Sequence, residues 1–192
     1  MSNANNSPPA TRLAAQIRLL VLDVDGVLTD GRLIYGADGS EAKAFNVRDG
    51  LGIKLAMHAG IEVAVISGRG GPAVERRMAE LGIRHVYLEQ EDKSAALAKI
   101  TAATAVELEY VACVGDDLPD MAIMERCALG IAVADAHRTA RGAADWVTEC
   151  PGGHGAVREV CDLLIAARAG QSRTDENRSD PDRSDPDRSN QG

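Results

Sequence analysis

Short apolar runs alternate along the chain with longer stretches in which apolar residues recur at helical spacing. The runs end at Gly-rich or polar turns, which is typical of buried strands in a parallel sheet. We predict strands at Ile17–Leu22, Glu62–Ile66, Val86–Leu88, Tyr110–Val114 and Leu129–Val133. We predict helices at Gly50–His58, Pro72–Leu81, Lys93–Ala103, Pro119–Arg126 and Ala156–Ala167. The alternation favours an α/β fold with a doubly wound, mostly parallel sheet and helices on both faces.

One segment interrupts this alternation. Arg32–Tyr35 and Ala42–Val47 flank the sequence Gly-Ala-Asp-Gly at residues 36–39, a pattern that predicts a β-hairpin around a Gly-rich turn. The hairpin directly follows the first predicted strand. Ligands of doubly wound sheets bind at the carboxyl ends of the strands, so the hairpin can lie over a ligand site as a flap.

Both ends of the chain have the composition of disordered segments. Residues 1–12 are rich in Asn, Ser and Pro, and residues 171–192 contain the quasi-repeat RSDPDRSDPDRS, which offers no apolar side chains to bury. Residues 13–170 remain as one domain, a length that supports a sizeable hydrophobic core.

Composition narrows the classes of function. The formal net charge of −8 argues against non-specific nucleic-acid binding, which needs a basic surface. The sequence shows neither an apolar run of about 20 residues nor a signal-peptide pattern, so we expect a cytoplasmic protein without membrane contact. The four cysteines lack metal-site spacing and are expected to be unreactive thiols: Cys113, Cys127, Cys150 and Cys161.

Two carboxylates follow the first predicted strand. Asp23 and Asp25 point to the same side of an extended chain because side chains alternate with a period of two. Two carboxylates in an apolar site repel each other, and a divalent cation resolves that conflict. Hard oxygen ligands suit Mg²⁺, which takes one or two carboxylates together with a substrate phosphate.

Cationic and anion-binding groups follow the later strands. Ser67, Gly68 and Arg69 come directly after Glu62–Ile66, where a hydroxyl and free backbone N–H groups form an anion cradle. Lys93 opens a predicted helix, and its ammonium group can neutralise charge on a phosphoryl group during transfer.

A second acidic cluster follows Tyr110–Val114. It contains Asp116, Asp117 and Asp120, which can complete a metal site, although Asp120 is equally explained as a helix cap. Each of these signals is weak alone, since single acidic turns and single lysines are common on protein surfaces. Their joint occurrence at successive strand ends indicates phosphoryl-transfer chemistry.

The order of these motifs resembles that of the haloacid dehalogenase superfamily of phosphotransferases, which has a Rossmann-like core. More narrowly, the chain resembles the family of 3-deoxy-D-manno-octulosonate 8-phosphate (KDO 8-phosphate) phosphatases, enzymes of lipopolysaccharide precursor synthesis. The matching stretches are LDVDGVLTDG, KAFNVRDGLGIK, ISGR, VGDDLPD and GGHGAVREVCDLL, which together span nearly the whole domain. KAFNVRDG is the most specific of them.

The resemblance implies a role for each motif. Asp23 would be the nucleophile that forms an aspartyl phosphate, and Asp25 the general acid and base. Mg²⁺ would be held by Asp23, the backbone carbonyl of Asp25, and Asp116. Ser67, with Gly68 beside it, and Lys93 would bind the phosphoryl oxygens. Two further carboxylates would orient water or the lysine: Asp117 and Asp120.

Arginines are the candidates for recognition of the sugar acid, because a guanidinium group binds carboxylates in a bidentate manner. Arg69 is the first candidate, followed by Arg48, while Arg158 is equally explained as a surface residue. His154 stands where the family more usually has Arg or Lys, which leaves open either a weaker substrate contact or a histidine without function.

Spacing between the motifs leaves no room for a cap domain. Only 44 residues separate Asp23 from Ser67, and 26 separate Ser67 from Lys93. The resemblance implies a homotetramer in which a neighbour's hairpin helps to close each site. The hairpin at Arg32–Val47 and the segment Gly152–Arg158 would then supply substrate specificity.

Three other functions remain open from the sequence. The substrate can be a nonulosonate 9-phosphate of the sialic-acid type instead. A signalling receiver domain also combines acidic residues, a hydroxyl residue and a lysine, but its phosphorylated Asp lies on a middle strand. A non-catalytic sugar-phosphate-binding protein is disfavoured because Asp23 and Asp25 are both present.

Overall fold

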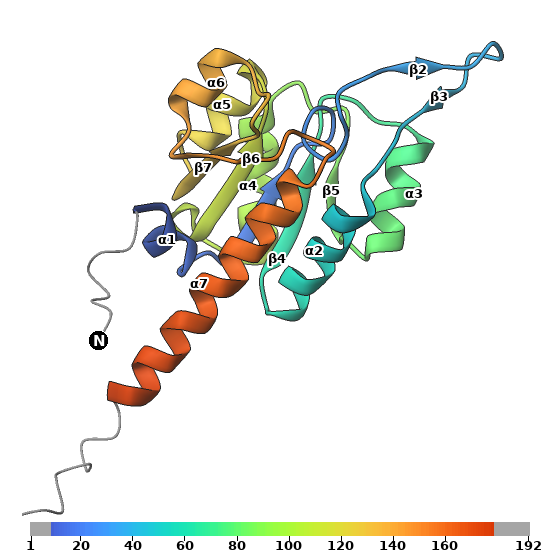
Figure 1. The fold of residues 1–192 in the computed structure, drawn as a ribbon. Coiled ribbons are helices and arrows are strands. Elements are labelled where there is room, and N and C mark those ends of the chain that lie inside the picture. Colours follow the sequence, from blue (N-terminus) through green and yellow to red (C-terminus); the bar gives the residue numbers. More distant parts are fainter. Residues whose placement is uncertain (1–8, 179–192) are drawn as a thin grey trace, which may run out of the picture.

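A computed structural model describes residues 9–178 of the chain. Its centre is a parallel sheet of six strands in the order β5-β4-β1-β6-β7-β8 (Figure 1). The strands are β1 (Leu19–Leu22), β4 (Glu62–Ile66), β5 (His85–Tyr87), β6 (Val111–Gly115), β7 (Leu129–Ala132) and β8 (Trp146–Val147). The predicted parallel sheet is confirmed, with β8 as a sixth strand too short for the apolar pattern to reveal.

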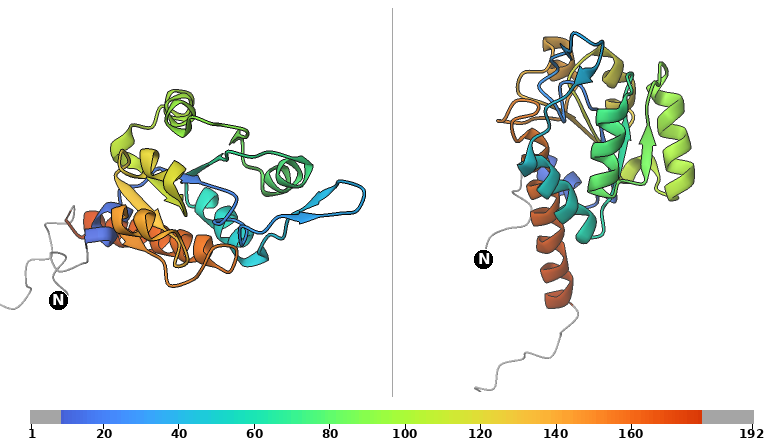
Figure 2. Two further views of the ribbon diagram at one scale, coloured as in Figure 1. Left: turned by 90° about the horizontal axis from the view of Figure 1, so that it is seen from above. Right: turned by 90° about the vertical axis from the view of Figure 1, so that its right-hand side faces the viewer.

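Helices cover both faces of this sheet. The helices α1, α2 and α7 pack together on one face, and α4 and α5 lie together on the other, as the view from above in Figure 2 shows. The bounds are α1 (Pro9–Ala14), α2 (Val47–His58), α3 (Pro72–Leu81), α4 (Lys93–Thr104), α5 (Leu118–Met124), α6 (Arg138–Ala143) and α7 (Ala156–Arg178). A short 3₁₀ helix, Leu108–Tyr110, leads into β6. None of the described helices is both long and apolar enough to cross a membrane.

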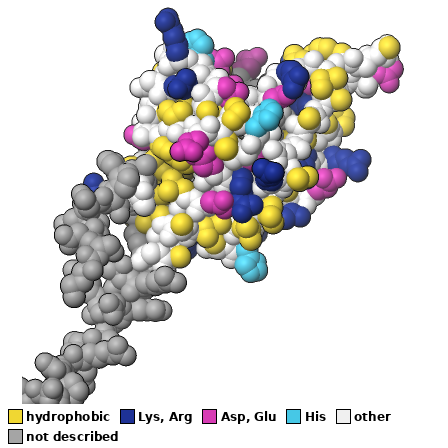
Figure 3. All heavy atoms as spheres, in the orientation of Figure 1, with side chains coloured by type: hydrophobic (Ala, Val, Ile, Leu, Met, Phe, Trp, Pro, Cys, Tyr) yellow, Lys and Arg dark blue, Asp and Glu magenta, His cyan; other side chains and the backbone are white. Residues whose placement is uncertain are grey.

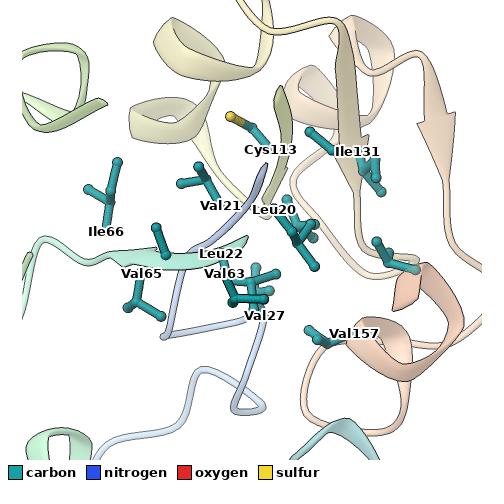
Figure 4. Packing of buried hydrophobic residues seen from close by; sticks show 14 of the residues in the cluster. Leu20, Val21, Leu22, Val27, Val63, Val65, Ile66, Cys113, Ile131 and Val157 are labelled. Carbon is teal, nitrogen blue, oxygen red and sulfur yellow. The ribbon is translucent and has the colours of Figure 1, made fainter. Parts of the chain in front are cut away.

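Aliphatic side chains fill the core between the layers. All four residues of β1 are buried, because β4 and β6 flank this strand and helices cover both of its faces. Figure 4 shows Leu20, Leu22 and Ile131 within this packing. Because only 3% of the residues are aromatic, branched aliphatic side chains provide most of the core packing. The four cysteines are free thiols.

The sheet topology brings three strand ends to one place. Leu22 is in register with Val65 of β4 and with Val114 of β6, so these three strands finish level with one another. From β1 the chain winds through β4 to β5 at one edge, whereas β6, β7 and β8 extend to the other edge. The boundary between β1 and β6 is therefore the switch point at which doubly wound sheets bind ligands.

The predicted hairpin is present but shorter than expected. Two-residue strands β2 (Ile34–Tyr35) and β3 (Glu41–Ala42) pair antiparallel and project away from the sheet in Figure 1. Gly39 provides the positive φ of 83° that the turn requires. The predicted strand Ala42–Val47 is wrong beyond Ala42. The Asn46 side chain accepts a hydrogen bond from the backbone of Arg48 and caps α2, which begins before the predicted position.

Other differences from the prediction lie at element ends. Helix α1 begins at Pro9, inside the segment predicted to be disordered, since proline suits the first turn of a helix. Helix α7 continues to Arg178, past the predicted boundary at residue 171, because each residue added to an existing helix forms a further backbone hydrogen bond. The remaining predicted disorder, at 1–8 and 179–192, lies outside the described residues. The short helix α6 was not predicted.

No cap domain interrupts the described chain. Between β1 and β4 lie only the hairpin and α2, and between β4 and α4 lie only α3 and β5. The prediction from motif spacing is therefore confirmed for residues 9–178, and the hairpin is the element that extends beyond the core fold at the carboxyl edge of the sheet.

Candidate active site

A cavity of about 420 Å³ lies at the carboxyl ends of β1, β4 and β6. Nine of the ten predicted site residues line it: Asp23, Asp25, Ser67, Gly68, Arg69, Lys93, Asp116, Asp117 and Asp120. Gln90, Glu91 and Pro119 complete its wall. The level strand ends explain this convergence, because each motif directly follows a strand of the same parallel sheet.

Arg48 is the exception. It lies exposed on the first turn of α2 and is not part of the cavity wall, so its contact with substrate stays a prediction. The helix that carries it begins at Val47, earlier than the sequence pattern indicated.

Lys93 is buried between two carboxylates. Its ammonium group donates to Oδ1 of Asp23 and to Oδ1 of Asp120, each at 2.6 Å, and its side chain is 6% exposed. Burial alone would lower the pKa of Lys93, but the charges and hydrogen bonds of the two carboxylates raise it. The lysine is therefore held cationic at the floor of the cavity.

Three carboxylates lie close enough to share a metal ion. Oxygen atoms of Asp23, Asp116 and Asp120 lie within 4.8 Å of one another. Asp120 is already engaged through both oxygens, since Oδ1 accepts from Lys93 and Oδ2 accepts from the backbone N–H groups of Asp116 and Asp117. Asp120 thus serves mainly to hold the loop and the lysine, and Asp23 and Asp116 are left to face a cation.

The electrostatics of these carboxylates fit a divalent cation. Burial, followed by the charges of Asp23 and Asp120, raises the pKa of Asp116 to about 8. Burial and Asp120 likewise raise the pKa of Asp23 against the lowering effect of Lys93. The space beside Asp116 also depends on Gly26, where a Cβ atom would lie 2.1 Å from Oδ2 of Asp116. Without a cation, ionisation of these two buried carboxylates is costly. A bound Mg²⁺ offsets that cost, and carboxylate oxygens are the ligands that it prefers.

Comparison with known proteins identifies the family of this site. The profile of haloacid dehalogenase-like hydrolases matches residues 86–159. The 3-deoxy-D-manno-octulosonate 8-phosphate phosphatase of Salmonella typhimurium is 52% identical over 162 residues, which cover 84% of this chain and 86% of that relative. The chain belongs to the KDO 8-phosphate phosphatase family. The resemblance predicted from the motifs is confirmed.

Solved structures of the KDO 8-phosphate phosphatase family share the fold. The enzyme from Yersinia pestis matches with a TM-score of 0.83 at 46% identity, covering 85% of this chain and 89% of that one. The enzyme from Moraxella catarrhalis matches with a TM-score of 0.82 at 40% identity, over 88% and 98% of the two chains. That structure is a complex with a magnesium ion, a phosphate ion and a KDO molecule. The cofactor of the family is therefore Mg²⁺, as predicted.

Ser67 and the turn after β4 form one wall of the cavity in this family member. Ser67 is buried, and its hydroxyl oxygen accepts a hydrogen bond from the backbone N–H of Arg69 at 3.2 Å. Its backbone N–H donates to Tyr87 of β5, and its carbonyl accepts from Gln90. The hydroxyl is thereby held at a rigid position where it can donate to a phosphoryl oxygen.

The hairpin contributes charged groups that the sequence reasoning missed. Lys43 forms ion pairs with Asp25 and Glu41, and Arg69 forms an ion pair with Glu41 at 2.7 Å. The only signal for Lys43 was its place at the start of KAFNVRDG, the most family-specific stretch. Nothing in the sequence pattern showed that this stretch turns back to the first motif.

The Gly152–Arg158 segment packs against the loop that follows β1. The backbone N–H of Gly153 donates to the carbonyl of Val27 at 2.9 Å, and Asn46 donates to the carbonyl of Gly153 at 3.2 Å. His154 is exposed, with Nδ1 at 2.8 Å from the Gly152 carbonyl, and is not part of the cavity wall. Arg158 pairs with Asp162 one turn along α7, which favours the surface interpretation of this residue.

The raised carboxylate pKa values predict an unusual pH dependence of stability. Asp116 binds a proton in the folded state at pH values between its ordinary pKa of 3.8 and about 8, whereas the unfolded chain does not. Raising the pH through this window therefore favours unfolding when divalent cations are chelated. Saturating Mg²⁺ should remove the decline, because the ion stabilises the ionised carboxylates.

Thermal unfolding in EDTA and in MgCl₂ between about pH 5 and pH 8 measures this effect. Asp116→Asn is the matched variant and should show neither the decline attributable to this group nor the full stabilisation by Mg²⁺. If the variant and the parent protein had the same pH dependence in EDTA, the raised pKa of Asp116 would be wrong.

Proposed function

We propose that this protein hydrolyses KDO 8-phosphate to KDO and inorganic phosphate. The observation that carries the proposal is a phosphatase cavity whose nucleophile, acid/base, phosphate-binding and metal-binding candidates lie together in a chain 52% identical to a phosphatase of that name. A receiver domain is incompatible with the family, and the intact pair of Asp23 and Asp25 supports a catalyst over a binding protein.

The first half of the reaction transfers the phosphoryl group to the protein. The carboxylate of Asp23 attacks phosphorus, the bond from phosphorus to the sugar oxygen breaks, and Asp25 donates a proton to that oxygen. Lys93, already fixed against Asp23, and the Ser67 hydroxyl stabilise the negative charge on the equatorial oxygens.

The second half releases phosphate. Asp25, now ionised, accepts a proton from a water molecule, whose oxygen attacks the phosphorus of the aspartyl phosphate. The bond to Asp23 breaks, and both carboxylates return to their starting states. When bound by Asp23, Asp116 and the carbonyl of Asp25, Mg²⁺ supplies electrostatic neutralisation between the nucleophile and the phosphoryl group.

Arg69 is the proposed specificity residue for the sugar acid. Its guanidinium group lines the cavity at the base of the hairpin, where Glu41 holds it in place. A guanidinium group there can bind the sugar carboxylate in a bidentate manner. Gln90 and Glu91 line the same cavity and can bind hydroxyl groups of the sugar.

A phosphate-release assay tests the proposed substrate. We expect turnover of KDO 8-phosphate at least about tenfold more efficient, in kcat/KM, than turnover of a nonulosonate 9-phosphate, because the longer sugar adds hydroxyl groups that the cavity must accommodate. EDTA should abolish both activities and MgCl₂ should restore them. A higher kcat/KM for the nonulosonate phosphate would show that the substrate belongs to the alternative class. The proposed mechanism would still apply.

We further propose that the protein forms a homotetramer through the hairpin and α2. Val47, Leu51 and Leu55 lie on one face of α2 at successive turns, and their side chains are 78%, 51% and 42% exposed. The hairpin adds the exposed residues Leu33, Ile34 and Tyr35, and hydrophobic side chains gather along it in Figure 3. An apolar surface of this kind marks an interaction site, and a second copy of the chain is the occupant that the family resemblance indicates.

Sedimentation velocity tests this assembly. Leu51→Glu places a charge in the middle of the apolar face and should convert the tetramer to smaller species, with loss of activity where a neighbour's hairpin closes the site. Lys99→Glu, on the exposed surface of α4, is the control and should leave the assembly unchanged. A parent protein that sediments as a monomer at micromolar concentration would rule out the assembly.

The cytoplasmic location and the role in lipopolysaccharide precursor synthesis stay predictions.

A further inference from the structure

The ammonium group of Lys43 lies between two carboxylates where the chain leaves the hairpin. It donates to Oδ1 of Asp25 and lies 3.1 Å from Oε1 of Glu41, and its side chain is only 2% exposed. A buried lysine held between two carboxylates has one position, in contrast to a solvated lysine that samples many rotamers. The hairpin is thus attached to the catalytic loop of its own chain.

The contact makes the two oxygens of Asp25 chemically different. Oδ1 accepts from Lys43, whereas Oδ2 is buried and has no hydrogen-bond partner among the described residues. Nε of Arg69 lies 3.8 Å from Oδ2, which is too long for a hydrogen bond. An oxygen that accepts from an ammonium group is a poor site for a proton, so Oδ2 is the oxygen that can carry one.

Two lysines of this region each pair with two carboxylates. Lys93 binds Asp23 and Asp120, and Lys43 binds Asp25 and Glu41. The first pair serves the nucleophile, and the second serves the acid/base residue. Because Lys93 is already engaged on both sides, it is not available to orient Asp25.

Glu41 and Arg69 hold Lys43 from the other side. Oε2 of Glu41 accepts from Arg69 at 2.7 Å while Oε1 faces Lys43. Asp25, Lys43, Glu41 and Arg69 therefore form a ring of alternating charges contributed by the loop after β1, the hairpin and the loop after β4. Rotation of the Asp25 carboxyl group would break the charge-assisted contact with Lys43.

We propose that Lys43 is a positioning residue that orients Asp25 for both proton transfers. With Oδ1 held by Lys43, Oδ2 delivers its proton to the sugar oxygen as the bond to phosphorus breaks. The same oxygen then takes a proton from the water that attacks the aspartyl phosphate. The inference rests on the proposed phosphatase function but names a residue and an atom that this function alone does not specify.

Leaving groups of different basicity test the proposal. A sugar alkoxide needs protonation as it departs, whereas p-nitrophenolate leaves readily without it. Lys43→Met should lower kcat/KM for the sugar-acid phosphate that the parent protein accepts by roughly 100-fold or more, the size of a lost general-acid contribution. The loss for p-nitrophenyl phosphate should stay below about fivefold, since kcat/KM reports only the steps up to aspartyl-phosphate formation.

A second measurement examines the hydrolysis step. In Lys43→Met, nitrophenol should appear in a rapid burst of about one equivalent per site, because the intermediate forms quickly but its hydrolysis, which needs Asp25 as base, is slowed. Lys43→Arg keeps the charge. Its kcat/KM for the sugar phosphate should be at least about tenfold higher than that of Lys43→Met. Lys99→Met, at an exposed lysine on α4 away from the hairpin and α2, is the matched control and should behave as the parent protein.

The possible results distinguish a failure of the role proposed for Lys43 from a failure of the proposed phosphatase function. Equal losses for both substrates would overturn the positioning role and assign Lys43 to phosphate binding or folding. Unchanged kinetics would overturn it as well. If Lys43→Met does not fold, Lys43→Gln, which also removes the charge, takes its place, and a ratio of its two kcat/KM values equal to that of the parent protein counts against the proposal. If the parent protein hydrolysed no phosphate ester, the proposed phosphatase function would be wrong, and the role of Lys43 would be wrong with it.

Discussion

Replacement of Asp23 by Asn should lower turnover by at least about four orders of magnitude, because the amide cannot form the aspartyl phosphate. The fold should remain. Asp23 is 7% exposed and burial raises its pKa, so the neutral amide is more easily accommodated than the carboxylate in the absence of a cation. Steady-state assays together with circular dichroism and thermal unfolding in EDTA measure both effects.

The control for Asp23→Asn is Asp162→Asn, which removes a surface carboxylate that pairs with Arg158. Exposed ion pairs contribute about 0–1 kcal/mol, so this variant should keep both activity and stability. Mg²⁺ should stabilise Asp23→Asn less than the parent protein, because one proposed ligand is lost. An active Asp23→Asn preparation, free of parent enzyme, would refute the assignment of the nucleophile.

Replacement of Lys93 by Met should cost both stability and activity. The methionine leaves Asp23 and Asp120 in the buried site without their shared cation, a loss of about 3–5 kcal/mol in the free energy of unfolding. Turnover should fall by about 10²–10³-fold or more, because the charge that stabilises the phosphoryl oxygens is removed. Chemical denaturation in EDTA measures the loss of stability, and steady-state assays measure the loss of turnover.

A double variant separates the two effects of Lys93. Lys93→Met combined with Asp120→Asn removes one of the two stranded charges and should recover part of the lost stability. It should recover no activity, since the cation remains absent from the phosphoryl site. If Lys93→Met alone unfolded like the parent protein, the buried ion pairs would not hold the site together. Recovery of activity in the double variant would show that Lys93 acts only by neutralising Asp120.

Local patterns predicted the elements that lie in the sheet and against it. Glu62–Ile66 and Pro72–Leu81 match the structure at both ends, because a buried apolar strand and a Pro-initiated helix are each defined by their own residues. Val47, at the start of α2, was assigned to a strand because an apolar residue fits both patterns, and only the cap by Asn46 decides for the helix.

Asp120 acts both as a helix-capping residue and as a partner of the active-site lysine. The sequence left it between a helix cap and a catalytic-site residue, and the structure gives it both tasks. One oxygen completes the capping box at the start of α5, and the other holds Lys93. A cap is a local feature that four residues define, whereas the contact with Lys93 joins residues 27 positions apart and needed the sheet to bring them together.

The sequence by itself determined the family, the parallel sheet and the place of the phosphatase motifs, because strand ends that carry Asp23, Ser67 and Asp116 meet at one edge of any such sheet. Only the tertiary structure decided how charges pair within the cavity. It placed Lys43 on Asp25 and Arg48 outside the cavity wall, since both positions depend on how the hairpin turns and where α2 begins. Periodicity specifies which face of an element is buried, but the meeting of two charged side chains depends on the angles of the turns between them.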